Sequence, residues 1–158
     1  MSSAESRAYE PTVERFGPEP ASGRTIVVGV DGTDTAMRAA AYAFGLARRQ
    51  GYRLLVAFVA ARSALALTGP AAVFEHRTQR QLHAELSAEL RSSAEELGVP
   101  VTFVMVHGDP LTVLRDAADC GHADAVVVGA STSAGHRFAG SVATRLIRAG
   151  HWPVVVVP

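Results

Sequence analysis

Five short apolar runs, rich in β-branched residues, recur along this chain, and segments with helical periodicity separate them. A continuous apolar run of this length is typical of a strand that is covered on both faces. Regular alternation of strands and helices predicts right-handed βαβ units. The fold class is therefore α/β, with an open, parallel five-stranded sheet and helices on both faces. The five runs are residues 26–30, 53–59, 101–106, 125–128 and 153–157.

The segments between these runs carry the signals of helix ends. Gly51 follows a row of small apolar residues and is a suitable C-terminal stop. Asp109 and Pro110 form an N-cap with proline at the first helical position. The helices are predicted over residues 36–47, 82–97, 111–118 and 142–147, and the mixed residues 60–74 are expected to form a loop.

Residues 1–23 differ from the rest in having few large apolar side chains and three prolines among Glu and Ser. This composition predicts a disordered N-terminal tail. The remaining residues, 24–158, are long enough for one domain with a hydrophobic core.

The charged residues and the single cysteine exclude several function classes. All 15 basic residues are arginine, so a Walker-type phosphate loop and Schiff-base chemistry are excluded. The formal net charge is zero, which argues against binding to nucleic acid. Cys120 has no partner for an intramolecular disulfide, and no apolar run approaches the ~20 residues of a membrane span. A cytoplasmic protein without membrane contact is expected.

One segment, residues 123–142, combines an apolar strand, a loop of small residues and Gly-Ser at the start of a helix. In α/β proteins this arrangement presents backbone N–H groups to a phosphate at the carboxyl end of a parallel sheet. Gly129 and Gly140 would let the backbone approach the phosphate, while Ser141 would cap the helix and offer a hydroxyl. The alternative is a plain strand-to-helix loop.

Other polar residues allow weaker hypotheses. Asp31 could contact a nucleoside or a metal, or could simply be a turn residue. Arg137 and His136 could neutralise phosphate charge or form a solvated pair. Ser131, two residues after Gly129, resembles the nucleophile of a hydrolase, with His151 downstream. No acid lies between them, however, and a hydrolase is not expected. His76 and His83 are seven residues apart, which does not fit a zinc pair, so no metal site is expected.

Several motifs, in this order, resemble those of the universal stress protein family. Each is short, but together they extend over the whole predicted domain. They are Val30-Asp31-Gly32-Thr33 after the first strand, Gly108-Asp109-Pro110 after the third, Ala123-Asp124 before the fourth, Gly129 with Gly140-Ser141-Val142 around the fourth loop, and Trp152-Pro153-Val154 before the last strand.

The resemblance implies an adenine nucleotide alpha-hydrolase-like fold with strand order 3-2-1-4-5. It also implies binding of ATP, ADP or AMP, with Mg as a possible companion, in a stress-response or sensing role. The positions that match the family's nucleotide contacts are Asp31, Val59, Gly129, Thr132, Gly140, Ser141 and Val142. A homodimer through the C-terminal strand, residues 154–157, is expected as well, because an apolar edge strand favours pairing.

The glycine loop departs from the nucleotide-binding pattern of that family. Thr132 stands where a second glycine is usual, and seven rather than nine residues separate it from Gly140. The alternative function is therefore a dimeric interaction module of the same fold that binds no nucleotide. No residue set is typical of rapid catalysis, so the protein is not expected to be an enzyme beyond slow ATP hydrolysis. An adenylate-transferring enzyme would need an acid/base pair or metal-binding carboxylates around the loop, and the sequence shows none.

Overall fold

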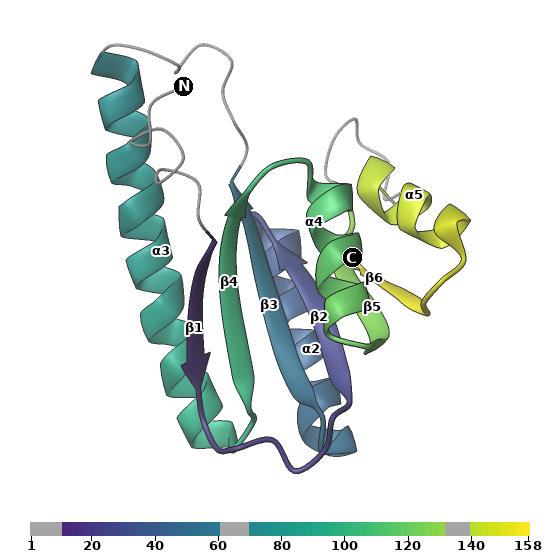
Figure 1. Cartoon of the computed structure of the whole chain (residues 1–158). Helices are drawn as coiled ribbons and strands as arrows, with labels where there is room; N and C mark the ends of the chain where they lie inside the picture. The colour runs from purple at the N-terminus through teal and green to yellow at the C-terminus, as the bar shows by residue number, and fades with distance from the viewer. Residues whose placement is uncertain (1–10, 61–69, 132–139) are drawn as a thin grey trace.

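The computed structural model describes residues 11–60, 70–131 and 140–158 of the chain, which form a layered α/β domain (Figure 1). Side chains are described for all of these residues except 70–77. The elements are β1 (Thr12–Phe16), β2 (Thr25–Val30), α2 (Asp34–Gln50), β3 (Arg53–Ala60), α3 (Pro70–Leu97), β4 (Val101–His107), α4 (Pro110–Cys120), β5 (Ala123–Gly129), α5 (Ser141–Ala149) and β6 (Val154–Val157).

The strands form one sheet in the order β1-β4-β3-β2-β5-β6. All neighbouring pairs are parallel except β1 with β4. The predicted α/β class is confirmed, and the order β4-β3-β2-β5-β6 is the expected 3-2-1-4-5 with one strand added. In Figure 1 the parallel strands β2, β3 and β4 point upward, so that their carboxyl ends lie at the same edge of the sheet.

The added strand β1 corrects the sequence analysis, which assigned residues 1–23 to a disordered tail. Within that segment, Thr12–Phe16 forms a strand that pairs antiparallel with β4 along five residue pairs. Residues 1–10 lie outside the described part of the chain. β1 was missed because its main support is the long-range pairing with β4, which local composition does not reveal.

Two hydrophobic clusters lie on opposite faces of the sheet and account for the layers. On one face α2 and α3 pack against alternate residues of the strands, with Phe44, Leu90 and Phe103 among the buried side chains. On the other face α4 and α5 pack against the remaining positions, with Leu114 and Leu146 at the centre. Helices on both faces are thus confirmed, and the central strands β2 and β3 are covered on both faces as their continuous apolar sequences predict.

The helix boundaries follow local chemistry, with one exception. α2 starts after Thr33, whose side chain accepts a hydrogen bond from the backbone N–H of Ala36, and it ends at Gly51 in the left-handed conformation. α3 begins at Pro70, so the loop expected over residues 60–74 is wrong from residue 70 onward. Residues 61–69 are outside the described part of the chain. Among the described helices, none has the length and apolar character needed to cross a bilayer.

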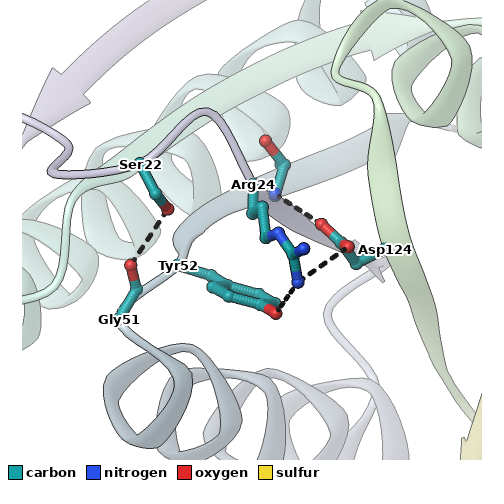
Figure 2. A network of polar contacts seen from close by, with 6 residues as sticks. Ser22, Arg24, Gly51, Tyr52 and Asp124 are labelled. Atoms are coloured by element: carbon teal, nitrogen blue, oxygen red, sulfur yellow. Dashed lines mark hydrogen bonds and ion pairs between the residues drawn. The ribbon is translucent and has the colours of Figure 1, made fainter.

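A network of polar side chains joins β2, β3 and β5 at their amino ends (Figure 2). Arg24 donates a hydrogen bond to the Tyr52 hydroxyl at 2.7 Å, and one of its nitrogens lies 4.0 Å from the Asp124 carboxylate. The same carboxylate accepts a hydrogen bond from the backbone N–H of Thr25 at 3.3 Å. This network fixes the entry of the chain into the central strand β2.

Candidate functional site

A cavity of about 300 Å³ lies at the carboxyl ends of β2 and β5. Its walls include the loop after β2, the end of β5 and the first turns of α2, α4 and α5. This is where open parallel sheets usually bind ligands, because the chain leaves β2 and β5 in opposite directions there. The site residues expected from sequence can therefore be compared with one defined volume.

Six of the seven residues expected from sequence lie in the described wall of this cavity. They are Asp31, Val59, Gly129, Gly140, Ser141 and Val142. The seventh, Thr132, falls outside the described residues, as do His136 and Arg137. The fold thus brings together positions more than 100 residues apart in sequence. Their contact with a ligand stays a prediction.

Asp31 and Thr33 form a tight hydrogen-bonded turn at the mouth of the cavity. The Oδ1 atom of Asp31 accepts hydrogen bonds from the backbone N–H of Thr33 at 3.0 Å and from its hydroxyl at 2.7 Å. The turn-residue interpretation of Asp31 is therefore correct for Oδ1. Within the described part of the chain, Oδ2 accepts no hydrogen bond, and Asp31 is the only charged residue among the described residues that line the cavity.

The first turn of α2 adds two hydroxyl groups that the sequence analysis did not assign to the site. Thr33 caps α2, and its hydroxyl oxygen lies 3.3 Å from that of Thr35. Both residues line the cavity, although Thr35 is only 6% exposed. A signal was present in the sequence, since small hydroxyl residues at the start of a helix below a strand end are typical of ligand-facing turns.

Gly129 is required by the packing of β5 against α2. A Cβ atom at this position would lie 2.7 Å from the Thr35 carbonyl carbon and 2.8 Å from the Ala36 nitrogen. Because those atoms belong to backbone, they cannot rotate away. The glycine therefore lets the end of β5 touch the first turn of α2, and this contact sets the width of the cavity.

The N-terminus of α5 faces the cavity without a side-chain cap. Gly140, not Ser141, is the N-cap residue, with an extended backbone at φ −62° and ψ 172°. The expectation that Ser141 caps the helix is wrong, because Ser141 is the first helical residue. Among the described residues no side chain caps α5. An α-helix leaves its first N–H groups without intrahelical partners, so those of α5 can serve an anion.

Gly140 also lies close to the other end of the same loop. A Cβ atom at this position would be 3.0 Å from the Cβ atom of Ser131, which lines the cavity beside Ala130. The backbone N–H of Ala130 donates a hydrogen bond to the Val157 carbonyl at 2.7 Å, which ties this end of the loop to β6. A larger residue at position 140 would therefore push into the cavity entrance.

α4 contributes a third helix N-terminus to the cavity through Pro110. Its N-cap, Asp109, accepts hydrogen bonds from the backbone N–H and the hydroxyl of Thr112, both at 2.9 Å. These bonds, the backbone one first, lower the pKa of Asp109 below its usual value of 3.8, and the charge of Arg145 adds to the effect. The partial positive charges of three helix N-termini thus point toward one volume.

The hydrolase hypothesis finds no support in this geometry. Ser131 lines the cavity, whereas His151 does not and instead packs edge-on against Trp152 at 5.2 Å between ring centroids. His83 lies on α3 beside β1, away from the cavity wall. The described residues also contain no group of three or more His, Cys, Asp or Glu side chains positioned to hold a metal ion.

The amino-acid sequence is similar to a known protein family and to curated proteins. A family model described as the universal stress protein family matches residues 23–158. A universal stress protein of Thermus aquaticus is 33% identical over 138 residues, which cover 85% of this chain and 98% of that protein. One from Methanocaldococcus jannaschii is 29% identical over 139 residues, covering 85% of this chain and 81% of that protein.

Solved structures show the same fold. The universal stress protein UspA from Lactobacillus plantarum superposes with a TM-score of 0.71 at 22% identity, covering 87% of this chain and 99% of that one. A universal stress protein in complex with cAMP has a TM-score of 0.63 at 29% identity, and the match covers 85% of this chain and 97% of that one. A universal stress protein from Archaeoglobus fulgidus in complex with dAMP has a TM-score of 0.58 at 25% identity, and the match covers 85% of this chain and 98% of that one.

Proposed function

Because this chain belongs to the universal stress protein family, we propose that it binds an adenine nucleotide in the cavity between β2, β5 and α5. Two structural neighbours carry cAMP or dAMP, which supports an adenine ligand for a cavity of this fold. The role that follows is nucleotide sensing in a stress response. Any turnover of ATP would be slow, since no described group of the lining is arranged as an acid/base pair.

The uncapped N-terminus of α5 is the observation that carries this proposal. Gly140 leaves the first N–H groups of the helix open toward the cavity, beside the exposed Ser141 hydroxyl. Phosphate oxygens are suitable acceptors for such groups, and the helix dipole favours their negative charge. We assign the phosphate to Gly140, Ser141 and Val142 for this reason.

The nucleoside would occupy the opposite wall. Val59 is 8% exposed at the end of β3 and offers its backbone to the base, while Asp31 lies at the mouth of the cavity. The Oδ2 oxygen of Asp31, which accepts no hydrogen bond from the described residues, suits a sugar hydroxyl, or a Mg ion if one accompanies the phosphates. Gly129 would act indirectly, by holding α2 and β5 close together.

The number of phosphates that the site favours follows from loop length in the sequence. The loop is two residues shorter than the nucleotide-binding pattern, which removes up to ~7 Å of chain reach. Thr132 also disfavours positive φ angles that glycine adopts freely. We therefore propose that ATP binds little better than ADP or AMP.

Thermal unfolding with added nucleotide tests the proposal. At a hundred times its Kd, a ligand of the folded state adds about 2.7 kcal/mol, or roughly 5–10 °C in Tm for a domain of this size. Gly140→Val should abolish the shift, because its side chain would meet Ser131. Gly23→Val is the matched control, since a Cβ there has no neighbour within 4 Å.

The same experiment decides between the proposal and its alternative. If ATP, ADP and AMP at millimolar concentration give no shift in the unaltered chain, the protein is better described as an interaction module that binds no nucleotide. Replacing Thr132 with Gly and inserting two residues between Ser133 and Gly140 should raise ATP affinity selectively. Calorimetry on both forms measures this difference.

We propose further that the protein forms a homodimer through β6. This strand lies at the edge of the sheet, and its four valines are only partly buried. An apolar edge strand favours pairing with a second copy about a two-fold axis. Val155→Lys places a charge at this edge and should favour the monomer in light scattering at tens of micromolar. Thermal unfolding of the variant checks that the domain still folds.

A further inference from the structure

β1 lies between the edge of β4 and the helix α3 (Figure 1), and we refer to the space that β1 occupies there as the groove. The family match begins at residue 23, so β1 precedes the part of the chain that corresponds to the family domain. Its five residues pair antiparallel with Val101–Met105 of β4. A strand added to a sheet edge in this way is one of the modes by which proteins bind extended peptides.

α3 presents a carboxylate-binding subsite to this strand. The hydroxyl of Ser87 donates a hydrogen bond to Oε2 of Glu14 at 2.8 Å, and Nε2 of His83 lies 3.0 Å from Oε1. A guanidinium nitrogen of Arg91 lies 4.0 Å from Oε2. The three helical residues are spaced at i, i+4 and i+8, so they form one row along the helix. Glu14 is 26% exposed between them.

An aromatic subsite follows two residues further along. The Phe16 side chain is 8% exposed, and the guanidinium carbon of Arg91 lies 5.0 Å from the centre of its ring. Because side chains of a strand alternate between faces, Glu14 and Phe16 point to the same side. Val13, on the other side, is 47% exposed. α3 therefore contacts an acidic residue of β1 and an aromatic residue two positions later.

The contact between Glu14 and α3 borders open space. Nε2 of His83 is buried and close to Glu14, but its alignment is not that of a hydrogen bond, and it has no other partner among the described residues. An open volume of about 560 Å³ borders Glu14 along α3, and its wall includes Ala84, Ala88 and Ser92 as well as the acidic Glu95. Short elements with few buried apolar side chains open at low free energy, and in β1 only Phe16 is fully buried.

We propose that the groove between α3 and β4 is a peptide-binding site for an extended segment with a carboxylate and, two residues later, an aromatic ring. β1 is its intramolecular occupant, and a matching segment of a partner protein displaces it. The main-chain ladder with β4 supplies affinity, and the two subsites on α3 supply specificity. Since β1 is tethered to β2 by residues 17–24, it competes at an effective concentration in the millimolar range.

A fluorescent peptide with the sequence of residues 9–19 tests this proposal by anisotropy. The receptor is the full chain carrying Glu14→Arg, which places a cation against Arg91 and releases the chain's own β1. We expect this variant to bind the peptide at least tenfold more tightly than the unaltered chain does, because the tethered β1 no longer competes. Glu14→Gln in the full chain is a milder second receptor that keeps the size of the side chain and should give an intermediate affinity.

Two altered peptides serve as controls, one with Gln in place of Glu14 and one with Ala in place of Phe16. Each should bind the released receptor at least fivefold more weakly than the natural sequence. Equal binding of all three peptides, or no binding to either receptor, would overturn the proposal. Dimers of the unaltered chain that exchange β1 would also overturn it, since the occupant would then be a second copy. Native mass spectrometry of mixed labelled and unlabelled chains detects that outcome.

Discussion

The two ends of the central sheet differ in how they use polar groups. At the amino end, side chains satisfy one another: Arg24 bonds to Tyr52 and faces Asp124, which accepts from Thr25 (Figure 2). At the carboxyl end, the N-terminus of α5 faces a cavity with no side-chain cap among the described residues. The same strands therefore carry a closed polar network at one end and open backbone donors at the other.

This difference separates polar groups that pair within the protein from groups that are available to a ligand. The amino-end groups are largely solvated, with 64% of the Arg24 side chain and 35% of the Asp124 side chain exposed, so their pairing stabilises little. Hydrogen bonding to the Tyr52 hydroxyl is the main cause that raises the pKa of Arg24, and the Asp124 carboxylate adds to the effect. The carboxyl end depends instead on Gly129, a residue without a side chain.

Gly129→Ala should give the largest effect of any single substitution at the two ends, since it acts on both stability and binding. Its Cβ would lie within 2.8 Å of the backbone of α2, and relief of that overlap requires the helix to move. We expect a loss of about 1–3 kcal/mol in the free energy of unfolding, together with loss of the nucleotide-induced Tm shift. Urea unfolding and calorimetry measure the two effects.

Gly23→Ala is the matched control for this comparison, because a Cβ at position 23 has no neighbour within 4 Å. It should leave both measurements unchanged. If Gly129→Ala kept the stability and the binding of the unaltered chain, the close contact of β5 with α2 would not define the cavity.

Thr33→Ala should have a smaller effect at the same end. It removes the cap that accepts from the Ala36 N–H and the hydroxyl that donates to Asp31. Loss of a helix cap costs about 1 kcal/mol, or roughly 2–4 °C in Tm. The Asp31 carboxylate keeps only its bond from the Thr33 backbone N–H, so it should be held less firmly and nucleotide binding should weaken. Thr33→Ser keeps the hydroxyl and should leave both the stability and the nucleotide binding close to those of the unaltered chain. A full loss of binding in Thr33→Ser would show that the methyl group matters instead.

The order of the elements was predictable from sequence, because each buried strand is a continuous apolar run and each helix has local stop signals. Gly51, for example, ends α2 in the left-handed conformation that its sequence position indicated. The edge strand β1 was not predictable in this way. Phe16 is its one buried apolar residue, and its support comes from β4 and α3, which lie far away in sequence.

The candidate site was predictable as a region and less so in its details. Gly129 and Gly140 were expected to allow close approach of a phosphate, which stays a prediction, and the structure adds a close protein neighbour that the sequence did not indicate: α2 for Gly129 and Ser131 for Gly140. Thr35 was missed although its place in the first turn of the helix was a signal, because the packing of α2 on β5 that brings it to the cavity wall is a long-range contact. Whether a helix begins at residue 140 or 141 depends on backbone angles that composition does not determine.

Asp124→Asn tests the other end of the sheet and should change little. The amide oxygen can still accept from the Thr25 N–H, and the lost ion pair with Arg24 is solvent-exposed and 4.0 Å long. We expect a loss of no more than about 0.5 kcal/mol in stability and an unchanged nucleotide Kd. Urea unfolding and calorimetry measure both. A marked loss of nucleotide affinity would mean that the two ends of the sheet are coupled and do not act separately.

The smallest expected effect concerns Asp109 at the cavity end and appears only in acid. Its ionised carboxylate accepts two bonds from Thr112, which lower its pKa in the folded state below the usual 3.8. A carboxyl group with a lowered folded pKa stabilises the fold above the unfolded pKa, and this contribution is lost as the pH falls through the folded pKa.

Asp109→Asn keeps a capping oxygen but does not titrate. The Tm difference between the unaltered chain and Asp109→Asn should therefore be small and constant from pH 7 to about pH 5, and should shrink as the pH falls through 3.8 and below. Thermal unfolding of both chains across this range measures the difference. A difference that grows toward acid pH, or does not change with pH, would show that the charge of Asp109 does not contribute to capping α4.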